Sequence, residues 1–316
     1  MINPKISLVI PLYNEEKSLP FLIERLNKLT SNSDISFEIV LVDDGSNDDT
    51  ANICNQIALS DDRYHCIFLA RNYGHQIALS AGISVASGIE GLMIIDGDLQ
   101  DPPELFFEFY SYFSKGYDVV YGVRKNRKEN FFKKSAYFIF YRILKKISSI
   151  NIPLDSGDFS LISRRVADVL NKMPEESRYI RGMRSWIGFK QIGIEYERDE
   201  RIAGNSKYSF SMLMKLAFNG IFNFSEIPIK FITILGVFSV LVSLIYFVIT
   251  LIKKLFYIDV PVGFTGLLFV IILFGGVQLI SLGIIGEYIV RIFFQVKNRP
   301  LFIIKNRIKE KHTSSQ

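Results

Sequence analysis

The chain has 316 residues, enough for one sizeable α/β domain and a smaller second part, and it carries a net charge of +5 with a pI near 9.0. This charge fits an anionic partner such as nucleic acid, phospholipid or a phosphorylated substrate. A hydrophobic content of 49%, a mean hydropathy of +0.22 and aromatic residues concentrated toward the carboxyl half disfavour a fully soluble protein and indicate an added membrane part.

Cysteine and histidine spacing gives no sign of a metal site. Cys54 and Cys66 are the only cysteines, and because they lack metal-ligand spacing we expect buried free thiols. The three histidines form no ligand pattern either. Residues 1–7 run directly into a strand pattern instead of a secretory signal, so we expect the amino-terminal part to stay on the cytoplasmic side.

The first hundred residues alternate between strand and helix patterns. Strands are predicted at 6–11, 37–42, 66–70 and 91–95, with a helix after the first strand and another at 75–86. Residues 46–49 offer a helix cap with acids in the first turn. This order predicts a parallel sheet with right-handed crossovers. No G-x-G-x-x-G motif follows the first strand, which disfavours a dinucleotide site.

Each of these four strands ends in a polar cluster. The clusters are residues 13–15, 43–46, 71–74 and 96–101. In parallel α/β sheets, ligands bind outside the carboxyl ends of the strands. Four clusters at one edge are harder to dismiss as solvated turns than any one alone, so we expect a ligand site there.

The cluster after the fourth strand has the residues for a cation site. Asp96 and Asp98 are two apart, so a strand would point both carboxylates to one side, and Gly97 leaves room for a ligand. Carboxylate oxygens suit Mg²⁺ or Mn²⁺. Pro102 and Pro103 end the strand and open the next helix. An isolated pair of this kind is more often an acidic turn, so the metal interpretation depends on the other strand ends.

A basic segment follows the fifth predicted strand, 117–123. Residues 124–128 form a basic loop, and the predicted helix 131–148 interleaves aromatic residues with cations that include Lys134. This helix has either a solvated cationic face or a face that lies against a membrane or cradles phosphates. Residues 157–161 are predicted to form a turn that leads into another strand.

Two long uncharged runs indicate that the protein is a membrane protein. Residues 231–252 span roughly 33 Å as a helix, which matches a bilayer core of roughly 30 Å, and 264–285 is a run of similar length. Buried core helices are the alternative, which two charge-free runs disfavour, so we predict a transmembrane hairpin. Because more cations flank its outer ends than its loop, we expect an inner-membrane protein with both termini in the cytoplasm.

The predicted organisation therefore has four parts. They are a cytoplasmic catalytic domain at 1–208, an interfacial amphipathic helix at 209–230, the transmembrane hairpin at 231–290 and a cytoplasmic tail at 291–316. Together these parts describe transfer from an activated nucleotide to a component of the membrane.

A transfer of this kind needs a neutralised diphosphate. A divalent ion on Asp96 and Asp98 would make the nucleoside diphosphate a better leaving group by Lewis-acid assistance. Arg124 and Arg127 are candidates to share that negative charge.

The nucleoside itself has candidates at the first two strand ends. Asp44 is placed to accept hydrogen bonds from a base or ribose, Tyr13 to stack on the base, and Glu15 to order the loop. Glu15 and Asp44 also have a plainer interpretation as acids at helix starts.

Five motifs spread over nearly the whole chain carry a family resemblance. They are VIPLYNEE at 9–16, VDDGS at 42–46, DGDLQDPPE at 96–104, GDF at 157–159 and GEYI at 286–289. The sequence resembles glycosyltransferase family 2, with a GT-A fold. Within that family it is most similar to the polyprenyl-phosphate glycosyltransferases, which include the bactoprenol glucosyltransferases of phage and bacterial O-antigen modification and dolichol-phosphate mannosyltransferase. The family usually has alanine or valine at the position of Gly97, a departure that should leave the metal site intact.

The resemblance implies roles for particular residues. It implies donor contacts at Pro11, Tyr13, Glu15 and Asp44, and metal or diphosphate contacts at Asp96, Asp98 and Gln100. It also implies a mobile acceptor loop, matched here by residues 201–207, in which Arg201 and Lys207 would hold the lipid phosphate with Gly204 as a hinge. Lys134 is a further candidate for that phosphate. Without the family, the loop is a flexible basic connection next to an interfacial helix.

The favoured mechanism is a single in-line displacement at the anomeric carbon with inversion. A phosphate monoester acceptor is already an anion at neutral pH, so the enzyme must supply positioning and charge neutralisation more than a strong base. Asp158 lies where family 2 enzymes with hydroxyl acceptors place their base. Here we expect Asp158 to orient the acceptor or a sugar hydroxyl.

Two other classes of function remain open. A processive polysaccharide synthase is weakened by having only two spans and no Q-x-x-R-W motif, and a non-catalytic flippase component or scaffold is disfavoured by the intact acids. Motifs at 157–159 and 185–188 are more similar to those of bactoprenol glucosyltransferases than to those of aminoarabinose-transferring relatives. This resemblance implies UDP-glucose as donor, with UDP-galactose, UDP-N-acetylhexosamine and GDP-mannose open. The partners expected are a nucleotide sugar, polyprenyl phosphate and the membrane, not nucleic acid. The resemblance implies a homotetramer.

Overall fold

A computed structural model describes residues 4–125, 156–197, 227–256 and 263–308 of the protein. The chain divides into two compact units, one of residues Met1–Ala217 with Pro300–Gln316 and the other of Phe218–Arg299. Several predicted features lie outside the described residues: Arg127, Lys134, Arg201, Lys207, the helix at 131–148 and residues 209–226 of the interfacial segment 209–230.

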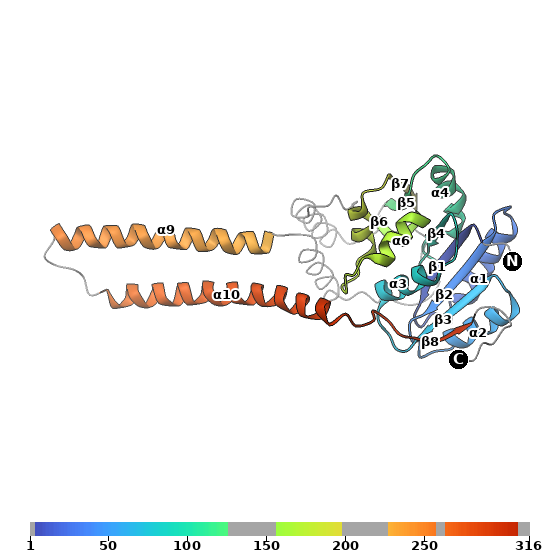
Figure 1. Cartoon of the computed structure of the whole chain (residues 1–316), viewed down its shortest axis with the longest axis horizontal. Coiled ribbons are helices and arrows are strands. Elements are labelled where there is room, and N and C mark those ends of the chain that lie inside the picture. Colours follow the sequence, from blue (N-terminus) through green and yellow to red (C-terminus); the bar gives the residue numbers. More distant parts are fainter. Residues whose placement is uncertain (1–3, 126–155, 198–226, 257–262, 309–316) are drawn as a thin grey trace. The chain divides into compact units, whose positions relative to one another are not determined.

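The first unit is an α/β structure built on one sheet (Figure 1). Its described strands are β1 (Ile6–Leu12), β2 (Phe37–Asp43), β3 (Tyr64–Leu69), β4 (Gly91–Ile94), β5 (Val119–Lys125), β6 (Ser156–Ser163), β7 (Gln191–Glu197) and β8 (Ile304–Ile308). Its described helices are α1 (Leu19–Ser31), α2 (Thr50–Ser60), α3 (His75–Val85), the 3₁₀ turn η1 (Pro103–Leu105), α4 (Phe106–Phe113), α6 (Arg164–Lys172) and α7 (Ile180–Ile187). Pro103 thus begins a helical turn, as the sequence predicts.

The described strands form an eight-stranded sheet in the order β7-β5-β6-β4-β1-β2-β3-β8. Strands β4, β1, β2 and β3 run parallel, with Val9 opposite both Val40 and Ile94. Strand β6 is antiparallel to β4 and β5, and β8 is antiparallel to β3. The predicted parallel sheet is confirmed, and its four carboxyl ends lie at one edge.

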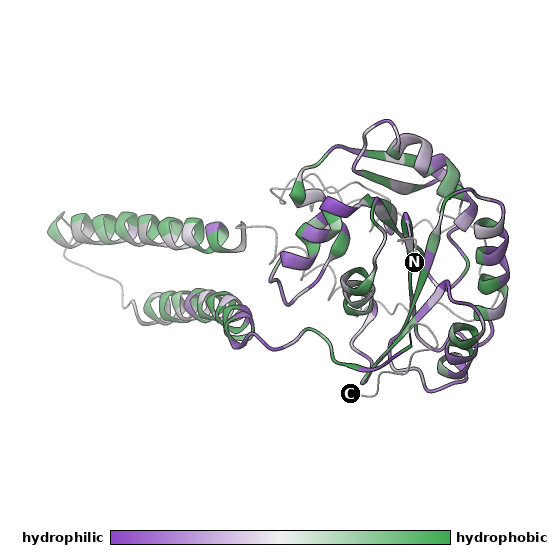
Figure 2. Ribbon diagram, turned by 45° about the vertical axis from the view of Figure 1, so that its right-hand side comes forward, coloured by the Kyte–Doolittle hydropathy of each residue, from purple (hydrophilic) through white to green (hydrophobic). Residues whose placement is uncertain are grey.

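The core lies on both faces of the parallel strands. Every residue of β1, β2 and β4 is buried, which is typical of parallel strands covered by helices on both sides. One face of α1 packs Leu19, Leu22 and Leu26 into this core. Figure 2 shows the same division, with hydrophobic strands inside and hydrophilic outer helix faces. A Cβ on Gly82 of α3 would lie 2.4 Å from Val9 Cγ1, so glycine lets α3 approach the sheet closely.

Two local predictions are wrong. Residues 157–161 do not form a turn but lie within β6, because they pair antiparallel with β4 and β5 in the middle of the sheet. The prediction of acids in the first turn of the second helix is also wrong, because α2 begins only at Thr50, after Asp48 and Asp49. The N-cap Asp49 makes no side-chain capping bond, and Asp48 Oδ1 accepts the Thr50 N–H at 3.1 Å instead.

Strand β8 is a feature that the sequence analysis missed. Residues 304–308 pair with β3, and Ala70 donates its N–H to Ile303 O at 2.9 Å. Arg307 Nε also donates to His65 Nε2 at 3.0 Å. The chain therefore leaves the first unit before the second unit and returns to it afterwards.

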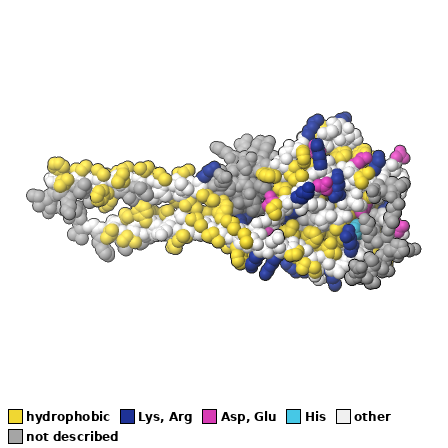
Figure 3. Space-filling view, in the orientation of Figure 1, with side chains coloured by type: hydrophobic (Ala, Val, Ile, Leu, Met, Phe, Trp, Pro, Cys, Tyr) yellow, Lys and Arg dark blue, Asp and Glu magenta, His cyan; other side chains and the backbone are white. Residues whose placement is uncertain are grey.

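The second unit contains the helices α9 (Ile227–Phe256) and α10 (Phe264–Lys297). Each has a stretch long and apolar enough to cross a membrane, Ile229–Ile249 in α9 and Leu273–Lys297 in α10, and neither stretch is buried in the structure. Figure 3 shows hydrophobic side chains exposed along both helices. The predicted run at 231–252 falls almost entirely on the first stretch, whereas the second stretch begins and ends later than the predicted 264–285.

Candidate active site

The first three polar clusters meet at the carboxyl edge of the sheet. Both oxygens of Asp44 accept backbone hydrogen bonds from the loop after β3, one from Tyr73 N–H and one from Gly74 N–H, each at 2.8 Å. Asn14 of the loop after β1 donates its N–H to Ser46 Oγ at 3.0 Å. Burial raises the pKa of Asp44 above its ordinary value, against the effect of these two N–H donors.

Gly45 allows the loop after β2 to approach the loop after β3 closely. Its φ of +68° lies in the left-handed region, and a Cβ there would lie 2.6 Å from the backbone carbon of Arg71. Only glycine fits both the turn and the neighbouring chain without a shift of backbone.

The predicted donor residues of the first loop lie at the same edge. Pro11 is buried in β1 opposite Val42, and Tyr13 is half-buried. Glu15 takes part in the bonding of its own loop, since its N–H donates to Thr50 Oγ1 at 2.8 Å and its Oε2 accepts from Ser18 Oγ at 2.7 Å.

Asp96 and Asp98 lie on a turn beyond β4. The strand ends at Ile94, so the prediction that a strand aligns the two carboxylates is wrong. Asp98 Oδ1 instead accepts the N–H of Gln100 at 3.2 Å, which places Gln100 on the same turn. The space beside Gly97 is taken by β1, because a Cβ there would lie 2.6 Å from Leu12 Cδ2, and not by a ligand.

His75 joins this acidic turn to Asp158. Its Nε2 lies 3.5 Å from Asp96 Oδ1 and 3.5 Å from Asp158 Oδ2. Burial lowers the pKa of His75, but both carboxylates outweigh it and raise the pKa to about 9, so the ring is an imidazolium at neutral pH. Burial, together with the charges of Asp101, Asp98 and Asp158, raises the pKa of Asp96 to about 6 despite His75.

Asp158, on β6, is held as a carboxylate by three neighbours. Gln76 Nε2 donates to its Oδ2 at 2.7 Å, and Arg181 Nε lies 3.6 Å from its Oδ1. Burial raises the pKa of Asp158, but Arg181, His75 and Gln76 together hold it well below its usual range. Gln76 also accepts the N–H of Ile180 at 2.7 Å, which fixes the start of α7.

Arg124 belongs to a second network beside the acidic turn. Its Nε lies 3.5 Å from the hydroxyl oxygen of Tyr196, and that hydroxyl donates to the fully buried Asp101. Burial lowers the pKa of Arg124, but the charges of Asp101 and Tyr196 outweigh burial and raise the pKa above its ordinary value. The guanidinium therefore stays charged.

Five neighbours of these groups were not predicted as site residues: His75, Gln76, Asp101, Arg181 and Tyr196. Asp101 is in the predicted cluster 96–101, and His75 and Gln76 directly follow the cluster 71–74, so extending the clusters by two residues would have found them. Arg181 and Tyr196 follow no motif, and only the fold brings them to the site.

The acidic turn fits a divalent cation that is shared with a phosphorylated ligand. Within the described ranges, no three Asp, Glu, His or Cys side chains are grouped to hold a metal ion on their own. Asp96 and Asp98 would supply hard oxygen ligands. Burial and neighbouring acids raise the pKa of Asp96, and a bound cation would relieve this concentration of negative charge. A diphosphate would supply further oxygens.

Comparison with known proteins identifies the family. Residues 7–170 match the profile of Glycosyl transferase family 2. The chain belongs to this family. Among its relatives is the uncharacterized glycosyltransferase YkcC of Bacillus subtilis, 42% identical over 300 residues, which are 95% of this chain and 93% of that protein. The SfII prophage-derived bactoprenol glucosyl transferase of Shigella flexneri is 38% identical over 302 residues, 95% of this chain and 97% of that protein.

Family membership confirms the predicted GT-A type of α/β fold and the predicted glycosyltransferase activity. A crystal structure of mannosyl-3-phosphoglycerate synthase from Rubrobacter xylanophilus matches with 16% identity and a TM-score of 0.47, over 68% of this chain and 71% of that one. The family 2 profile includes β1 to β6 and therefore both Asp96 and Asp158.

Proposed function

We propose that this family 2 enzyme moves one sugar, glucose in the favoured case, from a UDP-linked donor to polyprenyl phosphate such as undecaprenyl phosphate. The observation that carries the proposal is the meeting of the acidic turn with the ionised Asp158 at the carboxyl edge of the sheet. Identity of 38% to a bactoprenol glucosyl transferase along nearly the whole chain, both apolar helices included, supports this acceptor.

The donor occupies the edge formed by β1, β2 and β4. Pro11, Tyr13, Glu15 and Asp44 contact the nucleoside, and Asp96, Asp98 and Gln100 hold Mg²⁺ or Mn²⁺ with the diphosphate. A bound cation supplies Lewis-acid stabilisation of the leaving diphosphate. Arg124 shares that charge from its network with Asp101. Arg127 is proposed for the same task, with Arg201, Lys207 and Lys134 at the acceptor phosphate.

The reaction is a displacement at the anomeric carbon. A phosphate oxygen of the acceptor forms the new bond to that carbon while the bond to the donor's diphosphate breaks, which inverts the configuration. Because a phosphate monoester is already an anion, it needs no strong base. The depressed pKa of Asp158 makes it a weak base, so its role is to orient the acceptor or a sugar hydroxyl.

The two apolar helices of the second unit support a reaction at the membrane. We propose that α9 and α10 cross the inner membrane as a hairpin with the first unit in the cytoplasm. Segments before and after the hairpin belong to the first unit, so they lie on one side of the membrane and the number of crossings is even. A homotetramer is proposed from the family resemblance alone.

Incubation of membranes that contain the protein with radiolabelled nucleotide sugars and undecaprenyl phosphate tests the proposal. We expect label to enter the lipid with UDP-glucose, to stop on addition of EDTA and to return with excess Mn²⁺ or Mg²⁺. A product that carries several sugars would support a polysaccharide synthase instead. Transfer that EDTA leaves unchanged, or no transfer with any donor, would contradict the proposal.

A further inference from the structure

Arg184 is a buried cation whose side chain has no hydrogen-bond partner among the described residues. It lies on α7 with 0% of its surface exposed, and none of its three guanidinium nitrogens has an acceptor in the described part of the chain. Its guanidinium lies over the ring of Tyr121, with Cζ 5.0 Å from the ring centroid. One aromatic face cannot satisfy five N–H donors.

Other arginines of the same unit show what a structural guanidinium looks like. Arg178, two residues before α7, is also buried, and it donates to Ser80 Oγ at 3.1 Å, Met173 O at 2.8 Å and Leu170 O at 2.9 Å.

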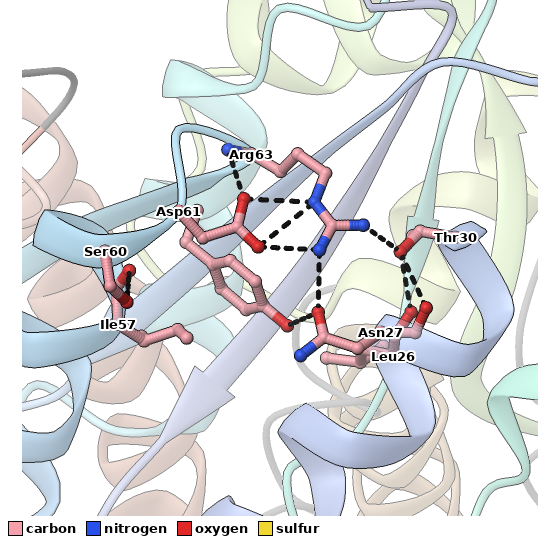
Figure 4. Close-up of polar contacts among 8 residues, drawn as sticks. Leu26, Asn27, Thr30, Ile57, Ser60, Asp61 and Arg63 are labelled. Atoms are coloured by element: carbon pink, nitrogen blue, oxygen red, sulfur yellow. Dashed lines mark hydrogen bonds and ion pairs between the residues drawn. The ribbon is translucent and has the colours of Figure 1, made fainter.

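Arg63 is satisfied in the same way at the opposite edge of the sheet (Figure 4). It donates to Asp61 at 2.6 Å, to Thr30 Oγ1 at 2.7 Å and to Asn27 Oδ1 at 3.0 Å. Arg184 differs from both arginines in lacking acceptors while being fully buried.

A buried charge without a partner is unfavourable in the folded protein. Burial lowers the pKa of Arg184 to about 10, with Asp158 acting against the shift and Arg181 adding to it. The side chain is therefore a cation at neutral pH, and its N–H groups match the oxygens of a phosphate.

The neighbouring charges place Arg184 on the Asp158 side of the site. The negative charge of Asp158 raises the pKa of Arg184, whereas the charges of Asp101 and Asp96 raise the pKa of Arg124. The two arginines thus interact with different acids. Arg124 lies with the acidic turn that would take the donor diphosphate, and Arg184 lies with Asp158, where the acceptor is expected.

We infer that Arg184 binds the phosphate of the acceptor lipid, through the guanidinium N–H groups that lack acceptors in the described structure. This inference rests on the proposed function, and it names a residue beyond those predicted for that phosphate. Arg181, which faces Asp158 at 3.6 Å on the preceding turn of the same helix, adds positive charge beside it.

The test compares full-length wild-type enzyme with Arg184→Gln and Arg184→Lys, and with Arg63→Gln as the matched control. We expect Arg184→Gln to raise the KM for undecaprenyl phosphate about 10- to 100-fold, the range for lost hydrogen bonds to a charged group, and to leave UDP-glucose affinity unchanged. Arg184→Lys keeps the positive charge but loses the paired N–H donors of the guanidinium. We expect its KM for undecaprenyl phosphate to lie between those of wild type and Arg184→Gln. Arg63→Gln keeps the wild-type KM.

Thermal unfolding without substrates separates binding from structure. Removal of an unpaired buried charge should leave the Tm of Arg184→Gln equal to or above that of wild type, whereas Arg63→Gln lowers it. Added undecaprenyl phosphate should raise the Tm of wild type and not that of Arg184→Gln.

Three results would overturn the inference. A weakened donor affinity with an unchanged lipid KM would assign Arg184 to the donor diphosphate. An unchanged lipid KM with a lowered Tm, or an Arg184→Gln protein that does not fold, would make Arg184 structural. A wild-type enzyme that transfers no sugar to lipid would contradict the proposed function instead, and the lipid-dependent Tm shift would still test whether Arg184 binds phosphate.

Discussion

At the scale of single residues, neighbours decide what the carboxylates of this site can do. Asp96 and Asp158 both lie 3.5 Å from His75, yet the pKa of Asp96 is raised to about 6 and that of Asp158 is depressed. Burial and the charges of nearby acids explain the first shift, whereas Arg181, His75 and Gln76 outweigh burial in the second. Two chemically identical groups thus differ in their tendency to hold a proton, which matches the different roles that we propose for them.

Gln76 is the side chain that joins three elements at this point. It bonds Asp158 of β6 and the N–H of Ile180 in α7 from its place on α3. We expect Gln76→Leu to lose about 1–3 kcal/mol of stability, because two buried polar groups lose their partner, and to lower turnover by freeing Asp158. Chemical unfolding and transfer rates measure these effects.

The matched control is Gln56→Leu, an exposed position on α2. This substitution should change neither the free energy of unfolding nor the turnover appreciably. If Gln76→Leu had the stability and turnover of the control, Gln76 would not organise the site.

Sequence motifs predicted the acids of the site better than their partners. Asp44, Asp96 and Asp98 follow apolar strands, so the strand pattern locates them along the chain. Arg181 and Tyr196 come from distant segments, and pairing across the sheet brings them in. A single sequence contains no local signal for such contacts.

At the scale of elements, burial decided which strands the sequence revealed. Strands β1, β2 and β4 are apolar throughout because helices cover both faces, so their pattern is unmistakable. Strand β8 is an edge strand with three exposed polar residues at its centre, which resembles a solvated tail. The sequence therefore predicted the parallel centre of the sheet and missed this edge.

A buried polar network ties together the ends of β1, β2 and β3 away from the site. Glu38 Oε2 accepts from Ser7 Oγ at 2.5 Å and from the Ser87 N–H at 2.8 Å, and His65 Nδ1 lies 3.6 Å from Oε1. Burial raises the pKa of Glu38, but His65, Ser7 and Ser87 outweigh it and lower the pKa from 4.5 to about 2.

This shift predicts an acid-dependent loss of stability. Above pH 4.5 Glu38 is ionised in both the folded and the unfolded chain, and between pH 4.5 and about 2 only the unfolded chain takes up the proton. The stabilisation, at most about 3 kcal/mol, is present above pH 4.5 and disappears as the pH falls through this window.

We expect the advantage of wild type over Glu38→Gln to shrink between pH 5 and pH 3 in unfolding measurements. Glu24→Gln, which removes an exposed acid on α1, should follow wild type more closely. A Glu38→Gln variant whose stability falls with pH as steeply as that of wild type would show that Glu38 does not carry the effect.

At the scale of the whole molecule, the apolar helices are an insertion between two segments of the first unit. The chain leaves that unit before α9, and β8 rejoins its sheet after α10. Both ends of the second unit are therefore joined along the chain to the first unit. This connectivity is compatible with the proposed transfer from a soluble nucleotide sugar to a lipid.

Across the whole molecule, the acidic turn of the first unit is proposed to support sugar transfer to a polyprenyl phosphate. The most direct test is mass spectrometry of the lipid product formed by purified full-length enzyme from UDP-glucose, undecaprenyl phosphate and Mn²⁺, with Asp98→Asn beside wild type. We expect wild type to add one hexose to the lipid phosphate, and Asp98→Asn to form no product while it folds and inserts normally. Near-normal product from Asp98→Asn, or no hexosyl lipid from wild type with any nucleotide sugar, would contradict the account.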